Sequence, residues 1–178
     1  IEEPVALGTA GAVGQLRPWI DGRGALVVNA DAWCSPDLGA FVHGWDGRRV
    51  RILVSGPGAF GPRSRVLASL LPADVVDRLR PEPSGLYEVC WRDAAATGRV
   101  DTVADDGPFV DCGSVASYLQ ANLLAVGAAG GAVVDPTAAC GPASVVTRSV
   151  VGAGARVEGE VRDTVVWPGA VVAPGEVL

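Results

Sequence analysis

Two short apolar runs in the sequence each end at an aspartate, and these two carboxylates are its clearest candidates for chemistry. Asp31 follows the run at 25–28, and Asp111 follows Phe109 and Val110. In an open α/β sheet, the carboxyl ends of the strands face the ligand. Two carboxylates there give the sparse oxygen coordination that Mg²⁺ prefers when phosphate oxygens of a substrate complete its shell. The sequence therefore predicts a Mg²⁺ site at Asp31 and Asp111.

Asp31 also has a structural alternative. The run at 25–28 ends in two adjacent valines and lies between Gly24 and the Ser35-Pro36 turn, which predicts a buried strand of a parallel sheet. A helix is predicted over 36–42, and an aspartate that precedes a helix often caps it. These residues alone leave the metal role and the capping role open. The same pattern at Asp111 favours the metal role.

A run of small residues at 5–14 leads into a helical pattern at 15–20. Backbone N–H groups at the N-terminus of a helix can approach a base or phosphate closely. The run is not a Walker loop, because it has no G-K-[ST], and it does not follow a strand in G-x-G-x-x-G form. The alternative is a helix that packs closely on its neighbour through Gly11 and Ala12.

Turn residues and periodicity predict the other elements of the first part. We expect a strand at 49–54, an apolar stretch at 66–71, a helix over 72–79, a β-rich run at 84–92, a short helix at 93–97 and a helix at 115–124 capped by Ser114. His43 is the single histidine, and a lone histidine on a helix is more often a surface or core residue than a ligand. Arg63 and Arg65 follow the loop 55–62; arginines beside a loop can bind phosphate but are more often solvated.

From Gly130 onwards the helical periodicity ends and small or β-branched residues recur every six positions. They are Val133, Ala139, Val145, Val151 and Val157, and then Val165, Val171 and Val177. Such a hexapeptide period predicts a parallel β-helix, in which each coil buries these residues by stacking on the next. The two-residue surplus between Val157 and Val165 is expected to be a loop. The open end at Leu178 suits self-association.

The composition argues against several classes of protein. The net charge is −6 and no arginine cluster is present, which argues against a nucleic-acid surface. No apolar run is long enough for a transmembrane helix and no secretion signal begins the chain, so we expect a cytoplasmic protein without a membrane partner. The cysteines, at 34, 90, 112 and 140, form no C-x-x-C pair and are expected to be reduced, mostly buried thiols.

Two residue types are absent. The chain has no methionine and begins with Ile1-Glu-Glu-Pro, from which we expect a fragment of a longer protein. It also has no lysine, so every positive side-chain charge at neutral pH comes from arginine. Because the guanidinium group stays protonated, a step that depends on a tunable amine would have to be supplied from elsewhere.

Four motifs together resemble the sugar-1-phosphate nucleotidylyltransferases, a family that includes mannose-1-phosphate guanylyltransferase-like proteins. The segment at 7–12 (LGTAGA) is similar to the family's nucleotide-binding loop, and that at 27–31 (VVNAD) to its V-x-N-G-D strand. The segments at 109–114 and 118–122 resemble its W-x-D-x-G-T-P-x-x-Y-L-x-A-N motif. A short C-terminal β-helix is also an appendage of this family. The order of the motifs makes the resemblance specific.

The resemblance implies a reaction in which the phosphate of a sugar-1-phosphate attacks the α-phosphorus of an NTP and releases pyrophosphate. The partners would be an NTP and a sugar-1-phosphate, with Mg²⁺ as cofactor and with possible homo-oligomers formed through the β-helix. By motif position, Asp31 and Asp111 would be the catalytic, Mg²⁺-binding residues. The nucleotide would contact Gly8, Thr9, Ala10, Gly11 and Asn29, and the sugar would contact Gly85 and Tyr87.

The fold implied is a Rossmann-like nucleotidyltransferase mixed sheet at 1–130, incomplete at its N-terminus, followed by a short left-handed parallel β-helix at 131–178. The family's G-x-G-T-R-L-x-P phosphate loop and its two lysines are absent from these residues. The chain as given is therefore expected to be inactive. Loss of the first strand would also leave a sheet edge open to pairing with another chain.

Two other functions remain as alternatives. The missing lysines suggest a non-catalytic homologue that binds a nucleotide or an NDP-sugar and has a regulatory role. A hexapeptide-repeat acyltransferase would need a catalytic histidine in or near the β-helix coils. Because His43 lies far from them in the sequence, this last function is disfavoured.

Overall fold

The computed structural model describes residues 5–58 and 60–178. The chain divides into two compact units, Ile1–Phe109 and Val110–Leu178, and each is described by itself. Residues 1–4, on which the expectation of a fragment of a longer protein rests, lie outside the described residues, as does Ala59 in the loop 55–62. The domain boundary predicted at 130/131 remains a prediction.

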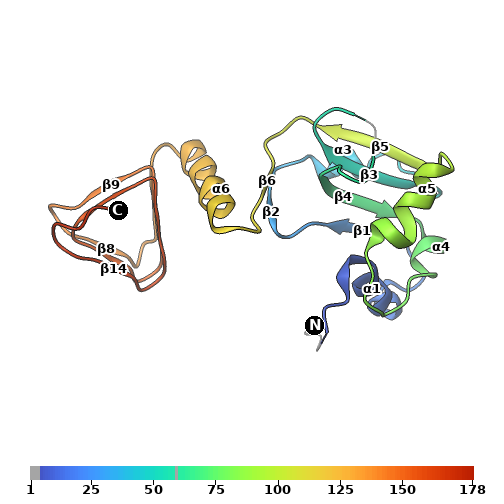
Figure 1. Ribbon diagram of the computed structural model, residues 1–178, viewed down its shortest axis with the longest axis horizontal. Helices are drawn as coiled ribbons and strands as arrows, with labels where there is room; N and C mark the ends of the chain where they lie inside the picture. The colour runs from blue at the N-terminus through green and yellow to red at the C-terminus, as the bar shows by residue number, and fades with distance from the viewer. Residues whose placement is uncertain (1–4, 59) are drawn as a thin grey trace. The chain divides into compact units, whose positions relative to one another are not determined.

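A four-stranded sheet in the order β1-β4-β3-β5 forms the centre of the first unit (Figure 1). Its strands are β1 (Ala25–Val28), β3 (Val50–Ser55), β4 (Val66–Leu71) and β5 (Val100–Asp105), and a two-residue strand, β2 (Ala32–Trp33), follows β1 in sequence. β4 is antiparallel to both β1 and β3, whereas β3 and β5 are parallel. The predicted mixed sheet is confirmed. β1, β3 and β5 run in one direction, so their carboxyl ends lie at the same edge.

The prediction that 25–28 is a buried strand of a parallel sheet is wrong. Among the residues that the structure describes, β1 is an edge strand that pairs only with β4, antiparallel, and its residues alternate between half-buried and exposed. Leu26 and Val28 are 42% and 43% exposed. Two adjacent valines fit an edge strand as well as a central one, because both place a branched side chain on a pleated surface.

Helices cover both faces of this sheet. One face carries α1 (Gly8–Gln15), α2 (Arg17–Ile20), α4 (Ala73–Val76), a π-helix η1 (Tyr87–Trp91) and α5 (Arg92–Ala96). The other face carries α3 (Leu38–Val42), whose Phe41 packs on Leu53 and Leu70. On the first face, Ala10 of α1 packs with Ile52 of β3. The result is a three-layer arrangement in which β3 and β4 are the most buried strands.

The segment 84–92, predicted to be β-rich, is helical from Leu86 onwards. Leu86 and Ala94 are buried and Cys90, between them at four-residue spacing, packs against the same core cluster. This spacing lets one helical face cover the sheet, so tertiary packing overrides the strand preference of Tyr, Val and Trp. The short helix predicted at 93–97 is confirmed as α5.

In the second unit, β6 (Val110–Asp111) leads into α6 (Val115–Ala128). Ser114 caps this helix as predicted: its side chain accepts a hydrogen bond from the Ser117 N–H at 3.1 Å, and the Ser117 hydroxyl accepts one from the Ser114 N–H at 3.1 Å. This reciprocal pair is a capping box with serine in the third helical position. The helix runs four residues beyond the predicted end at 124.

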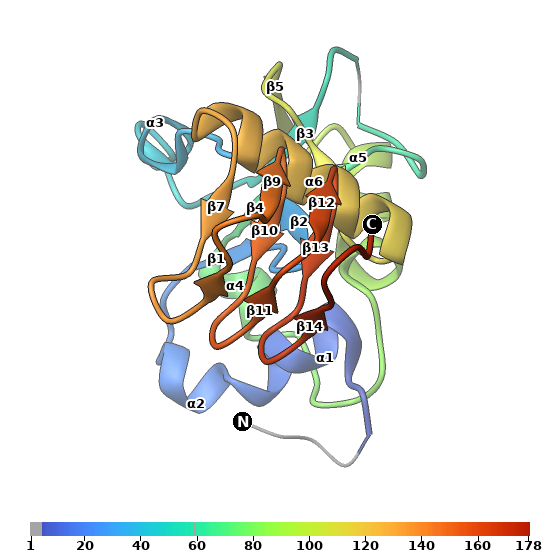
Figure 2. The ribbon, with the colours of Figure 1, turned by 90° about the vertical axis from the view of Figure 1, so that its left-hand side faces the viewer.

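Short parallel strands then stack in coils, as a β-helix requires (Figure 2). The three stacks are β7 (Val133–Val134), β10 (Val150–Val151) and β13 (Val165–Val166); β8 (Ala139–Cys140), β11 (Arg156–Val157) and β14 (Val171–Val172); and β9 (Val145–Thr147) with β12 (Glu160–Arg162). Every pairing within these stacks is parallel.

The set of inward residues differs from the predicted one. Val151, Val157 and Val161 fill the middle coil and are at most 1% exposed, whereas predicted members such as Val145 and Val171 are 40% and 65% exposed. The buried valines from Val151 to Val172 are six, four, five and six residues apart, and one corner of the coils, at 148–149 and 163–164, has only two residues. At that corner, Arg148 and Asp163 adopt φ values of 45° and 50°, and the Arg148 Nε donates to Asp163 Oδ1 at 2.7 Å.

The cysteines and the helices also bear on two expectations from the composition. All four cysteines are free; Cys140 is exposed and the others are half-buried, so they are less buried than predicted. Within residues 5–58 and 60–178, none of the helices has the length and apolar character needed to cross a membrane.

Candidate functional site at the carboxyl edge of the sheet

Asp31 lies just beyond the carboxyl end of β1 and is exposed. It does not cap the next helix, because Asp37 does so: its Oδ1 accepts a hydrogen bond from the Ala40 N–H at 2.9 Å. The structural alternative for Asp31 is therefore excluded. The Asp31 carboxylate therefore does not cap α3, and it lies at the edge of the sheet where β1, β3 and β5 all end.

Asn29 holds the end of β1 in place. Its backbone N–H donates to the carbonyl of Leu67 at 3.1 Å and its Nδ2 donates to the carbonyl of Val66 at 2.8 Å. One side-chain N–H is thus used by structure, and the second N–H and the carbonyl oxygen of the amide remain for a ligand. The nucleotide-binding role that the resemblance implies for Asn29 remains a prediction.

Asp105, at the carboxyl end of β5, adds a carboxylate that the motif search missed. Its carbonyl accepts a hydrogen bond from the Gly56 N–H at 2.8 Å, which ties the loop after β3 to β5. Burial raises the pKa of the Cys34 thiol, and the nearby Asp105 carboxylate raises it further. The Asp105 Oδ2 itself accepts a hydrogen bond from the Gly107 N–H at 3.1 Å. The alternating run at 100–105, which ends at an Asp106-Gly107 turn, was the available signal.

The small residues of α1 serve helix packing first. A Cβ on Gly8, Gly11 or Gly14 would lie 2.6, 2.2 or 2.4 Å from the carbonyl oxygen of Ser84, Glu82 or Arg80 respectively. The Ala10 N–H also donates to the Ser84 carbonyl at 3.0 Å, and the Gly11 N–H donates to it at 3.4 Å. The packing alternative is thus confirmed at Gly11 but is wrong for Ala12, which is exposed. The amides of Ala10 and Gly11 are already used.

Thr9 and Gly8 still face open space. They line a hollow of about 690 Å³ beside β1, with a mostly apolar wall that includes Val13, Leu16 and Leu26. The Thr9 hydroxyl accepts a hydrogen bond from the Leu86 N–H at 3.0 Å, so its proton is available to a second partner. A flat apolar group with a polar edge would suit this hollow.

An aromatic cluster forms where the loop after β3 meets η1. The Phe60 ring lies 5.8 Å from that of Trp91 at 83° and 6.1 Å from that of Tyr87 at 56°. Because a π-helix closes its bonds from i to i+5, residues four apart lie on nearly the same side. Gly85 lies just before η1, where an added Cβ would meet the Glu88 carboxylate at 2.2 Å. The Glu88 carboxylate therefore lies over Gly85, on the same π-helix that supplies Tyr87 and Trp91.

Asp111 belongs to the second unit, in β6, and is exposed. Its Oδ1 accepts a hydrogen bond from the Gly113 N–H at 2.9 Å, which shapes the turn into α6. The strand β6 is not part of the four-stranded sheet, contrary to the expectation of two aspartates in one sheet. The pairing of Asp31 with Asp111 at one Mg²⁺ remains a prediction.

The donor chemistry fits a hard divalent cation, since both predicted ligands are exposed carboxylates. In the part of the chain that the structure describes, no group of three or more acidic, histidine or cysteine side chains could hold a metal. Any cation would thus depend on phosphate oxygens from a ligand to complete its shell. The Mg²⁺ site at Asp31 and Asp111 remains a prediction.

Arginines supply the positive charge near this edge. Arg63 and Arg65 are exposed, as expected for residues beside a loop, and the Arg65 guanidinium lies 6.0 Å from the centre of the Phe109 ring. Stacking on an aromatic ring still leaves the edge of a guanidinium able to donate hydrogen bonds.

Comparisons with known proteins test the resemblance. No family model matches the chain, and neither does any curated protein. Among solved structures, one described as a glucose-1-phosphate thymidylyltransferase from Bacillus anthracis, in complex with sucrose, matches with a TM-score of 0.56 and 17% identity over 69% of this chain and 63% of its own. HddC from Yersinia pseudotuberculosis matches at 0.50 and 18% over 67% and 63%.

A third match extends over nearly the whole chain. A structure described as mannose-1-phosphate geranyltransferase from Thermus thermophilus has a TM-score of 0.50 and 16% identity over 96% of this chain and 68% of its own. This chain spans less than two thirds of the first two proteins. The fold is thus a nucleotidyltransferase-like mixed sheet followed by stacked parallel strands. The structural matches to sugar-1-phosphate nucleotidyltransferases confirm the predicted resemblance at the level of fold.

Proposed function

We propose that this protein forms an NDP-sugar and pyrophosphate from an NTP and a sugar-1-phosphate in a Mg²⁺-dependent reaction. The observation that carries the proposal is the common direction of β1, β3 and β5. It gathers Asp31, the loop after β3 and Asp105 at one edge of a sheet with a nucleotidyltransferase-like fold. Ligands of open α/β sheets bind at such an edge.

The hollow beside Gly8 and Thr9 is the proposed nucleotide site. A base is a flat group with polar edges. This hollow has an apolar wall and a Thr9 hydroxyl whose O–H can still donate a hydrogen bond. The amides of Ala10 and Gly11 support the site only indirectly, because they bind Ser84. Their role is to hold α1 against the segment that leads to the sugar side.

The aromatic cluster of Phe60, Tyr87 and Trp91 is the proposed boundary of the sugar site. The C–H faces of a pyranose ring pack well on aromatic rings, and a neighbouring carboxylate accepts its hydroxyl protons. Glu88, which lies over Gly85, can supply that acceptor. Tyr87 and Gly85 keep the sugar-side roles that the motif resemblance implies.

The chemistry proposed is mainly positioning and charge neutralisation. Asp31 and Asp111 would hold Mg²⁺, which supplies Lewis-acid stabilisation of phosphate charge when it is bound. The guanidinium groups of Arg63 and Arg65 would neutralise further phosphate charge. The sugar phosphate then attacks the α-phosphorus, and the bond to the pyrophosphate oxygen breaks. No covalent intermediate with the protein is required.

A regulatory homologue is the second candidate, and the absence of lysine favours it. Arginine binds phosphate through a planar fork, whereas lysine supplies a compact point charge that can follow a moving phosphate group. A chain with arginine alone can bind a nucleotide or an NDP-sugar without stabilising the transition state. This candidate predicts binding without turnover.

Pyrophosphate release distinguishes the two candidates. We expect the full-length protein with Mg²⁺ to release pyrophosphate with one pair from a grid of NTPs and sugar-1-phosphates. Asp31→Ala should lower that rate by a factor of about 100 or more, because a charge-stabilising group is lost. Asp77→Ala is the control, since Asp77 lies exposed at the end of α4, and it should keep the rate.

Release of no pyrophosphate over the whole grid, from a folded protein that still binds a nucleotide, would favour the regulatory homologue. Unchanged Mg²⁺-dependent nucleotide affinity in both Asp31→Ala and Asp111→Ala would contradict the metal assignment.

A further inference from the structure

A second hollow lies at the opposite, amino edge of the same sheet. It is lined by Arg48 and Val50 at the start of β3, Pro72 just after β4, and Arg99 just before β5. Because β3 and β5 run from this edge towards Asp31 and the loop after β3, the hollow is separate from the candidate nucleotide and sugar sites. Its volume of about 460 Å³ lies within the range of small-molecule pockets.

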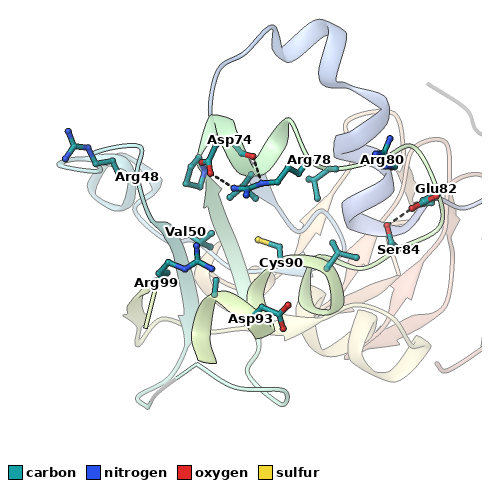
Figure 3. Close-up of a pocket in the computed structure, with 15 residues that line it drawn as sticks. Arg48, Val50, Asp74, Arg78, Arg80, Glu82, Ser84, Cys90, Asp93 and Arg99 are labelled. Carbon is teal, nitrogen blue, oxygen red and sulfur yellow. Dashed lines mark hydrogen bonds and ion pairs between the residues drawn. The ribbon is translucent and has the colours of Figure 1, made fainter. Parts of the chain in front are cut away.

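The charged residues of this hollow carry a formal excess of one positive charge, in a chain whose net charge is −6. They are four arginines and three acids, namely Arg48, Arg78, Arg80, Arg99, Asp74, Glu82 and Asp93. Figure 3 shows Cys90 among Arg78, Arg99 and Asp93, with Arg48 and Arg80 farther out on the rim. The local field therefore opposes the overall charge of the protein.

Two of the carboxylates already have arginine partners. Arg78 pairs with Asp74 one helical turn away and also donates to its carbonyl oxygen, and Arg92 lies 3.4 Å from Asp93. Arg99, like Arg48 and Arg80, forms no ion pair with a carboxylate of the described chain, and its Nε donates to the Thr97 hydroxyl at 3.0 Å. Of these three arginines, Arg99 lies nearest to Cys90 (Figure 3), so its terminal nitrogens are an uncompensated positive charge beside the hollow.

The floor of the hollow is apolar. Leu79 and Ala94 are buried, and Val75 and Val89 add further hydrocarbon surface. The Cys90 thiol lies among them, and burial raises its pKa from 9.0 to about 11. It is therefore uncharged at neutral pH and does not repel an anion.

We propose that this amino-edge hollow binds a small organic carboxylate. Arg99 receives the carboxylate through charge-assisted hydrogen bonds, and the short hydrocarbon part lies on Val75, Leu79 and Val89. A single negative charge matches the formal excess of one positive charge, whereas a phosphate dianion would also face Asp74 and Asp93. The site lies at the far edge of the sheet from the proposed chemistry, so a ligand here would be a modulator rather than a substrate.

The test is an NMR titration of the ¹⁵N-labelled protein with acetate, propionate and butyrate. We expect saturable shifts in the amide signals of residues 89–99. The affinity should rise about fourfold with each added methylene, because each one is buried on the apolar floor. Arg99→Gln should weaken butyrate binding by about tenfold or more. Arg65→Gln, at the opposite edge, should leave it unchanged.

A second pair of variants avoids any effect of Arg99 on folding. Val89 lines the hollow and is 50% exposed, so it tolerates a polar side chain. Val89→Glu should weaken butyrate binding by charge repulsion, and Val89→Gln, of the same shape, should weaken it much less.

The proposal is overturned if the shifts do not saturate, if acetate and butyrate bind equally, or if Val89→Glu and Val89→Gln behave alike. Inorganic phosphate that saturates the same signals at a lower concentration than butyrate would also overturn it, since the ligand class would then be a phosphate. None of these outcomes depends on pyrophosphate release, so this proposal and the proposed activity succeed or fail separately.

Discussion

Two side chains at opposite edges of the sheet differ in what surrounds them. Asp31 is exposed beyond the end of β1 and is excluded from helix capping by Asp37. Cys90 is half-buried in the helix η1, and burial is the main cause of its raised pKa. The carboxylate is thus available to a ligand as an ion, and the thiol serves as a neutral part of a pocket floor.

The raised pKa of Cys90 predicts a loss of stability at alkaline pH. The folded value of about 11 exceeds the ordinary value of 9.0, so folding favours the neutral thiol. This contribution to the free energy of unfolding is complete below pH 9 and is lost as the pH rises through 11. Urea unfolding from pH 8 to pH 11 should show a smaller decline for Cys90→Ala than for the wild type. Cys140→Ala, an exposed thiol, should follow the wild type; equal slopes for all three proteins would refute the prediction.

At the scale of elements, α1 and the segment at 80–84 form one packing unit. Gly8, Gly11 and Gly14 recur every three residues along α1, and the backbone at 80–84 lies directly against them. This contact holds the predicted nucleotide loop and the predicted sugar-side segment together. The glycines of the predicted nucleotide-binding loop therefore serve first to let the backbone at 80–84 pack closely against α1.

Because of this contact, we expect a single added methyl group at Gly14 to lower the stability of the fold. Gly14→Ala would bring Cβ to 2.4 Å from the Arg80 carbonyl oxygen, and the backbone would have to move. We expect the free energy of unfolding to fall by about 1 to 3 kcal/mol, as for other overpacked sites. Gly61→Ala, in the same unit with nothing within 4 Å of its Cβ, should change it by less than about 0.5 kcal/mol. Urea unfolding measures both, and similar effects would argue against close packing at Gly14.

For the whole molecule, open strand edges are the main features that a second chain could use. β1 has a neighbour on one side only, and so does β14 at the end of its stack. Val171 of β14 is 65% exposed and Leu178 is 49% exposed. Exposed apolar edge strands are templates for pairing with another chain.

The homo-oligomer predicted through the β-helix can be tested at this edge. Val171→Glu should reduce the mass in solution to that of one chain, 18.1 kDa, because a charge would be buried between copies. Val171→Thr keeps a β-branched side chain and should keep the oligomer. Light scattering measures the mass, and a larger mass that persists in Val171→Glu would place the contact elsewhere.

The sequence by itself determined the local features of this protein. Ser114 caps α6 because its hydroxyl needs only the next turn, and the repeated small residues after Gly130 specify stacked coils because each coil is a local repeat. The four motifs likewise indicated the nucleotidyltransferase-like fold. Each of these signals lies within a short stretch of chain.

Only the tertiary structure decided which faces and edges those stretches present. Within the described residues, β1 is an edge strand because it pairs with β4 alone, and 86–92 is helical because Leu86 and Cys90 pack on the sheet. The buried valines of the β-helix depart from the predicted six-residue period at the corner where Arg148 forms an ion pair with Asp163. The amino-edge hollow combines residues from β3, α4, η1 and the start of β5, and no local sequence pattern predicts that these distant segments lie together. Pairing and packing join distant segments, so their outcome depends on the whole chain.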